Sequence, residues 1–205
     1  MTYSTKRFDD HFEVILADTL ESQQIHYQLR YQVYCEELGF EDKHRFPDGL
    51  EYDDWDAHAV HFLVRHRLSG KWLGALRLVY HHQYQFPFET KCTTYHPLRK
   101  ADHQSSVEIS RLCIVKDARK LGFIHKHSPN PINTESTSAN NVSFINDFFW
   151  LNRSLMWGLI RTAAVYSRQN EIKDWFVLIA PSLAHILTKG GLELTQIGPP
   201  CEHKG

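Results

Sequence analysis

The chain has 205 residues, of which 42% are hydrophobic and 13% aromatic, and its 23 basic and 24 acidic side chains give a formal net charge of −1. These values predict one folded domain over residues 1–205 and exclude a disordered chain. The near-neutral charge excludes a global electrostatic field for nucleic acid, so no nucleic-acid partner is expected. No apolar run approaches the length of a membrane helix, and the polar start lacks the apolar core of a signal peptide. We therefore predict a cytoplasmic protein without an integral membrane segment.

Neither the cysteines nor the histidines form a recognised ligand pattern. The four cysteines lack C-x-x-C spacing, which predicts free thiols and no disulfide framework. The 14 histidines include close pairs, but none has the spacing of a metal-binding helix such as H-E-x-x-H. We therefore expect no metal site and no tightly bound cofactor.

The first half of the chain predicts a helix, a loop and a hairpin. Apolar residues recur near helical spacing over 21–38, and Gly39 follows as a C-terminal cap. Residues 40–56 are acidic and aromatic and contain proline and glycine, which indicates a loop. Alternating segments at 58–67 and 71–81, separated by a Ser-Gly pair, predict the two strands of a hairpin.

The second half predicts further alternation of strands and helices. The expected elements are an irregular connection at 81–105, a strand at 107–115, a mobile polar loop at 124–141, a helix at 142–169, a strand at 174–181, a helix at 182–191 and a last strand at 192–198. The chain shows no internal repeat and no domain linker. This layout predicts an α/β (α+β) fold with a mixed central sheet flanked by helices.

The strand expected at 107–115 carries an acid and a base, Glu108 and Arg111, inside an apolar run. Charged side chains are rarely buried unless they are paired, because an unpaired buried charge is costly. The two residues are therefore either a structural ion pair or part of a reacting site.

Four short motifs occur in order between about residues 25 and 115. They contribute Arg30, Tyr34 and Phe40 from LRYQVYCEELGF, Asp53 and Asp56 from EYDDWD, Arg77 from GALRL, and Glu108 and Arg111 from EISRL. In this order and spacing the chain resembles the acyl-homoserine-lactone synthases. It resembles more closely the N-acyl amino acid synthases and the acyltransferases associated with PEP-CTERM exosortase systems.

The resemblance implies a GNAT-like acyltransferase fold and an N-acyltransferase activity. A fatty acyl group would move from the thioester of an acyl carrier protein or coenzyme A to the amine of an amino acid or a related small molecule. Glu108 and Arg111 would form the catalytic pair, with Glu108 as the base that collects the amine proton. One alternative is a lactone synthase that uses S-adenosylmethionine. Another is a non-catalytic module that binds an acyl carrier or a lipid.

The acidic loop and two arginines are expected to bind the acceptor. Asp53 and Asp56 flank an aromatic residue, a combination that holds an ammonium group by charge and by a ring face. An arginine orients these carboxylates or grips a carboxylate of the acceptor. The expected substrate-binding set is Arg30, Tyr34, Phe40, Asp53, Asp56 and Arg77. The open alternative is a solvated acidic loop that only pairs with surface arginines.

The basic turn KDARKLGF, which follows the strand, is the expected donor site. Its candidate residues are Lys116, Arg119, Lys120 and Gly122. The resemblance implies that this turn receives the pyrophosphate of the donor, and its single glycine favours an acyl carrier protein over coenzyme A. Carrier proteins are acidic, which suits a basic docking patch, although an ordinary solvated turn has the same composition.

Overall fold

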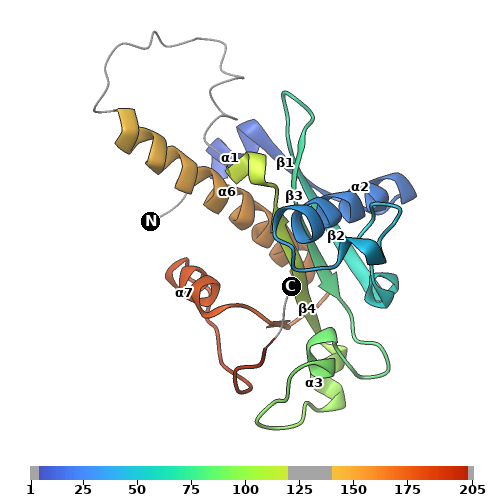
Figure 1. Ribbon diagram of the computed structural model, residues 1–205. Helices are drawn as coiled ribbons and strands as arrows, with labels where there is room; N and C mark the ends of the chain where they lie inside the picture. The colour runs from blue at the N-terminus through green and yellow to red at the C-terminus, as the bar shows by residue number, and fades with distance from the viewer. Residues whose placement is uncertain (1–4, 120–139, 203–205) are drawn as a thin grey trace.

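The computed structural model describes residues 5–119 and 140–202 and contains a five-stranded sheet in the order β1-β2-β3-β4-β5 (Figure 1). The strands are β1 (Phe12–Leu16), β2 (Ala59–His66), β3 (Trp72–Val79), β4 (Ser106–Ile114) and β5 (Asp174–Val177). Neighbouring strands are antiparallel except for β4 and β5, which are parallel. The predicted mixed sheet with flanking helices is confirmed.

Helices cover both faces of the sheet. They are α1 (Thr5–His11), α2 (Leu20–Arg30), α3 (Lys100–Gln104), α4 (Lys116–Arg119), α6 (Asn140–Gln169) and α7 (Pro181–Lys189). The helix α6 packs against β1 to β4, and α2 packs against β2 to β4. From Leu73 to Val79 every residue of β3 is buried, so both alternating sets of its side chains are covered.

The described residues also contain short helical turns. They are η1 (Tyr31–Glu37), η2 (Lys43–Arg45), η3 (Asp54–His58) and η4 (Pro87–Thr90). The helix predicted at 21–38 therefore consists of α2 followed by the π-helical η1. It starts at a capping box between Thr19 and Ser22. It ends before Gly39, whose φ of 65° is the left-handed conformation expected of a C-terminal glycine.

A bulge and a divergence of strands shape the middle of the sheet. Ala75 pairs with Cys113 and Arg77 with Ser110, so two residues of β4 lie opposite one residue of β3. The bulge contains Arg111, whose φ of 52° is uncommon for a residue with a side chain. The pairing of β4 with β5 ends at Ile109, whereas β4 continues for several residues. The sheet therefore opens beside the bulge.

The structure corrects two predictions made from the sequence. The segment 192–198 is not a strand; it lies beside the loop after η4, where Tyr95 donates a backbone hydrogen bond of 2.8 Å to Ile197. The expectation of four free thiols was also wrong, because Cys92 and Cys201 form a disulfide across 109 residues of sequence. Local spacing does not reveal that pair, since only the path of the C-terminal segment brings the two cysteines together.

Other expectations fall outside what the structure describes. The loop expected at 124–141 lies outside the described residues except for its last two positions, which begin α6. Among the helices that are described, none has the length and apolar character required to span a bilayer.

Candidate active site

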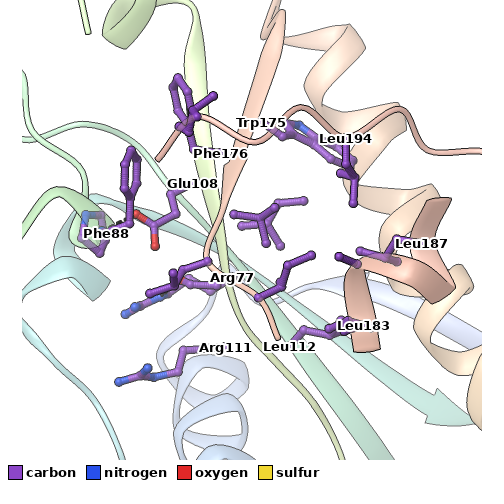
Figure 2. Close-up of a pocket in the computed structure, with 18 of the residues that line it drawn as sticks. Arg77, Phe88, Glu108, Arg111, Leu112, Trp175, Phe176, Leu183, Leu187 and Leu194 are labelled. Carbon is purple, nitrogen blue, oxygen red and sulfur yellow. Dashed lines mark hydrogen bonds between the residues drawn. The ribbon is translucent and has the colours of Figure 1, made fainter. Parts of the chain in front are cut away.

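A broad pocket of about 3240 Å³ lies where β4 and β5 diverge. Figure 2 shows Glu108 and Phe88 on one side of it and Leu183, Leu187 and Leu194 on the other. Most of the apolar lining comes from β4, the segment after β5, α7 and the chain beyond it. This volume exceeds that of a typical small-molecule site.

Glu108 is the buried acid of this pocket. It is 4% exposed, and its Oε2 accepts a 2.8 Å hydrogen bond from the backbone N–H of Phe88 in η4. Burial raises the pKa of the Glu108 carboxyl to about 7, although the Phe88 N–H group and the charges of Arg77 and Arg111 oppose the shift. A carboxyl with this pKa exchanges protons near neutral pH.

Glu108 does not pair directly with Arg111. Arg111 instead donates to Glu51 at 3.0 Å, to Glu41 at 3.4 Å and to Asp53 at 3.5 Å. The bulge separates the two side chains, because the left-handed conformation of Arg111 turns it toward the acidic loop. The simple strand ion pair considered from the sequence is therefore not what the structure contains.

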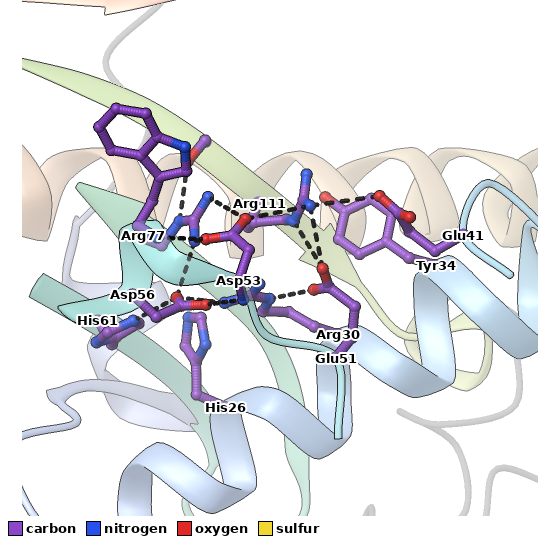
Figure 3. A network of polar contacts seen from close by, with 12 residues as sticks. His26, Arg30, Tyr34, Glu41, Glu51, Asp53, Asp56, His61, Arg77 and Arg111 are labelled. Atoms are coloured by element: carbon purple, nitrogen blue, oxygen red, sulfur yellow. Dashed lines mark hydrogen bonds and ion pairs between the residues drawn. The ribbon is translucent and has the colours of Figure 1, made fainter. Parts of the chain in front are cut away.

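Three arginines and four carboxylates form a connected network beside the pocket (Figure 3). Arg30 is fully buried and pairs with Glu51, and with Asp56 at 2.6 Å. Arg77 pairs with Asp53 at 2.6 Å and with Asp56 at 2.9 Å. The tertiary structure thus brings together residues that are up to 81 positions apart, from Arg30 to Arg111, on α2, the acidic loop, β3 and β4.

Two buried members of the network, Arg30 and Asp56, have strongly shifted pKa values. Burial alone would raise the pKa of Asp56, but a hydrogen bond from His61 and the charges of Arg30 and Arg77 hold it well below the usual range. The charges of Asp56 and Glu51 likewise overcome burial and raise the pKa of Arg30. Arg30 and Asp56 therefore stay ionised at any physiological pH, whereas the pKa of the Glu108 carboxyl lies near neutrality.

The network reaches the pocket through its less buried members. The side chain of Asp53 is 30% exposed and that of Arg111 is 13% exposed, whereas those of Arg30, Arg77 and Asp56 are at most 5% exposed. Asp53, Arg77 and Arg111 line the pocket. Glu41 also lines the pocket and its side chain is 15% exposed, so an incoming polar ligand meets Asp53, Glu41 and Arg111 before the buried members.

Two aromatic residues of the expected substrate-binding set also line the pocket. Tyr34 is buried under Arg111, whose guanidinium lies 5.4 Å from the ring centroid, and its hydroxyl donates to the Leu112 carbonyl at 3.2 Å. Phe40 is 47% exposed at the pocket margin, just after the Gly39 turn.

The expected donor residues are only partly described. Lys116 begins α4 and is exposed, and its backbone N–H donates to the Glu37 carboxylate at 2.8 Å. Arg119 ends α4. Lys120 and Gly122 lie outside the described residues. Among the contacts that the structure describes, none joins Lys116 to the arginine–carboxylate network.

Sequence reasoning missed several parts of the site. Glu41 and Glu51 complete the partners of Arg111, and their clustering in an acidic loop next to Gly39 was the available signal. The sequence did not single out the Phe88 N–H group, because every residue except proline has a backbone N–H group. Glu89 and His103, which join η4 to α3 through a 3.0 Å contact, were likewise not anticipated.

His103 supports the segment that orients Glu108. It is 4% exposed; its Nδ1 lies 2.9 Å from the Arg99 carbonyl and its Nε2 lies 3.0 Å from the Glu89 carboxylate. The ring therefore links the start of α3 to η4. Glu89 in turn accepts from the Phe86 N–H at 2.8 Å, which fixes the start of η4.

In residues 5–119 and 140–202, no group of three or more His, Cys, Asp or Glu side chains is arranged to hold a metal ion.

Comparison with known proteins agrees with this architecture. Residues 29–126 match the model of the acetyltransferase (GNAT) domain. A comparison with curated protein sequences found no match. The crystal structure of the AHL synthase LasI aligns over 95% of this chain and 85% of that chain, with a TM-score of 0.56 and 17% identity.

A second solved structure, a putative N-acetyltransferase from Lactobacillus plantarum, aligns over 93% of both chains with a TM-score of 0.49 and 13% identity. At 17% identity the match to the AHL synthase LasI shows a shared fold alone, and the domain match covers slightly less than half of the chain. The chain has the GNAT fold, and the part of it that matches the acetyltransferase (GNAT) domain model, residues 29–126, contains Glu108 and the whole arginine–carboxylate network.

Proposed function

We propose that this protein is an N-acyltransferase that moves a fatty acyl group from a carrier thioester to the amine of an amino acid or a related small molecule. The observation that carries the proposal is Glu108, a buried carboxyl with a pKa of about 7 beside an apolar pocket. A general base works best when its pKa lies near the working pH, and a structural carboxylate has no need of such a value.

The proposed reaction needs one proton acceptor and a held thioester. The amine nitrogen attacks the thioester carbonyl carbon, the carbon–sulfur bond breaks, and the carrier thiol leaves. Glu108 accepts the proton that the nitrogen loses, directly or through one water, and that proton neutralises the departing thiolate. The bulge at Arg111 leaves one extra residue of β4 outside the regular pairing, and a backbone N–H group of the bulge would bind the thioester oxygen.

The acceptor is proposed to contact the pocket side of the network. Asp53 would hold its ammonium group, and Arg111 would hold a carboxylate of the acceptor, since these two side chains retain exposure there. Arg30, Arg77 and Asp56 would act as positioning residues, because their buried ion pairs fix the two contacting groups. Tyr34 and Phe40 would shape the same wall.

An acyl carrier protein is the proposed donor, with coenzyme A as the alternative. The basic turn of Lys116, Arg119, Lys120 and Gly122 would meet the acidic surface of the carrier. Raising the ionic strength should then raise the KM for an acylated carrier far more than the KM for the same acyl-coenzyme A.

A second candidate is a lactone synthase that uses S-adenosylmethionine, which the fold shared with the AHL synthase LasI favours. Both candidates use the same acyl pocket and base, and they differ in the acceptor. Purified protein, an acylated carrier and a mixture of amino acids, with or without S-adenosylmethionine, would be analysed by mass spectrometry. N-acyl amino acids support the first candidate, and acyl lactones support the second.

Substitution of the base tests the catalytic role itself. Glu108→Gln keeps the shape of the side chain but removes proton acceptance, so acyl transfer should fall by about 10²–10⁴. Glu13→Gln is the matched control. Glu13 lies on β1, pairs with Arg65 and Arg67, and does not line the pocket. Equal activity of both variants would mean that Glu108 is not the base. No product from the wild type with any acceptor would instead favour the non-catalytic binding module.

A further inference from the structure

The Cys92–Cys201 disulfide joins two walls of the acyl pocket. Cys92 belongs to the loop 91–95 after η4, and Cys201 belongs to the segment 192–202, which contains no helix or strand. Residues of both segments line the pocket. The position of the wall formed by the segment 192–202 therefore depends on the disulfide.

Close contacts around the disulfide hold the two segments together. The Tyr95 backbone N–H donates to Ile197 at 2.8 Å, and the Gln196 side chain bridges the Tyr95 hydroxyl at 3.2 Å and the Gly198 carbonyl at 2.8 Å. A side chain at Gly198 would meet the Thr93 carbonyl oxygen at 2.3 Å, so glycine permits this approach.

A short path of hydrogen bonds connects the disulfide to the candidate base. The Cys92 backbone N–H donates to the Phe88 carbonyl at 2.8 Å. The N–H group of the same residue, Phe88, donates to Glu108 at 2.8 Å. Movement of the loop 91–95 therefore disturbs the turn that orients Glu108.

Thiol chemistry is confined to this pair of cysteines. Cys92 and Cys201 are partly exposed, so a small thiol is able to reach them. The other two cysteines, Cys35 and Cys113, are buried, and burial raises the pKa of their thiols to about 11 and about 12. Since thiolates are the reacting species, these two do not compete in exchange at neutral pH.

We propose that Cys92 and Cys201 form a thiol–disulfide exchange site that controls the order of the acyl pocket, a proposal that rests on the proposed function for its catalytic consequence. In the oxidised protein the disulfide fixes the segment 192–202 against the loop 91–95. Reduction releases that segment, loosens η4 and weakens both donor binding and the orientation of Glu108.

The exchange partners are a small disulfide for oxidation and a dithiol for reduction. In oxidation, two protein thiols give two electrons and two protons to a disulfide such as oxidised glutathione. The reaction passes through a mixed disulfide and releases two molecules of the thiol. In reduction, a dithiol attacks the protein disulfide, returns two thiols to the protein and becomes a disulfide itself.

Hydrogen–deuterium exchange of the full chain tests, without an activity assay, whether the disulfide orders the pocket. Oxidised wild type, wild type reduced with dithiothreitol and the Cys92→Ser/Cys201→Ser variant would be compared over peptides 86–95 and 192–202. We expect exchange in both peptides to rise about tenfold on reduction and to fall again with oxidised glutathione. The double variant should match the reduced protein and ignore both reagents. Unchanged exchange in 86–95 on reduction would overturn the proposal.

Steady-state kinetics with an acylated carrier or dodecanoyl-coenzyme A then separates the two proposals. If reduction raises the donor KM and lowers kcat, the exchange site controls catalysis. If exchange responds to reduction but KM and kcat do not, the bond is purely structural and the proposed control is wrong. If neither redox form turns over while exchange still responds, the proposed acyltransferase function fails and the ordering of the pocket by the disulfide stands.

Discussion

The backbone N–H of Phe88 donates to Oε2 of Glu108 at 2.8 Å, so the candidate base is oriented by a peptide group of η4. Among the contacts that the structure describes, Oε1 of the same carboxyl receives no hydrogen bond, which leaves it for the proton of an attacking amine. This relationship determines how Glu108 should respond to pH and to substitution.

The pH dependence of catalysis should follow the Glu108 carboxyl. Because the base must be deprotonated, kcat/KM should rise with pH and level off above a pKa of about 7. The profile would be measured with two acceptors whose amines differ in pKa. An inflection that stays at the same pH with both acceptors belongs to Glu108, and Glu108→Gln should abolish it. An inflection that moves with the acceptor would assign the titration to the substrate amine instead.

The same shift should make Glu108 destabilising at neutral pH. Its pKa is about 7 in the folded protein and about 4.5 when unfolded, so the folded state binds the proton more tightly. The free energy of unfolding should therefore fall as pH rises from about 4.5 to 7. At pH 8, Glu108→Gln should be up to about 3 kcal/mol more stable than the wild type, and the difference should vanish near pH 4. Urea unfolding at both pH values measures this; a less stable variant at pH 8 would contradict the burial argument.

Removal of the Arg30 side chain should lower the free energy of unfolding. Arg30 is fully buried between Glu51 and Asp56, so Arg30→Ala leaves two buried carboxylates without their shared partner. Loss of one member of a buried pair costs about 3–5 kcal/mol. Arg45→Ala is the control, because the Arg45 side chain is 68% exposed and its pair with Glu41 should contribute below about 1 kcal/mol. Equal losses in chemical denaturation would show that burial does not set the strength of these pairs.

Asp53 should govern the acceptor and not the donor. Loss of a hydrogen bond to a charged group costs about 1.5–3 kcal/mol, so Asp53→Asn should raise the acceptor KM about 10- to 100-fold with little change in the donor KM. The neighbouring Asp54 is exposed, which makes Asp54→Asn the matched control. Steady-state kinetics with each substrate varied in turn provides both constants. Parallel increases in the two KM values would indicate that Asp53 supports the fold of the pocket and does not contact the acceptor.

The disulfide should contribute strongly to stability. It closes a loop across 109 residues, and the chain-entropy model gives about 4–5 kcal/mol for a loop of that size. Reduced wild type and the Cys92→Ser/Cys201→Ser variant should lose a similar amount of unfolding free energy relative to the oxidised protein. A much smaller loss would mean that the unfolded chain is already compact around this pair.

The sequence by itself determined the elements whose physical signal is local. Apolar spacing located α2 and α6, alternation around a Ser-Gly turn located the β2–β3 hairpin, and charge inside an apolar strand singled out Glu108 and Arg111. A charged residue inside an apolar run is recognisable from the sequence at its own position, because burial of an unpaired charge is costly.

Only the tertiary structure decided which of these residues meet. The bulge turns Arg111 away from Glu108 and into the acidic loop, and the divergence of β4 and β5 forms the pocket. The raised pKa of Glu108 depends on its burial in the folded chain, and the disulfide depends on a segment that returns across the pocket. Electrostatic environment and long-range pairing depend on distances between distant parts of the chain, and a one-dimensional pattern does not contain those distances.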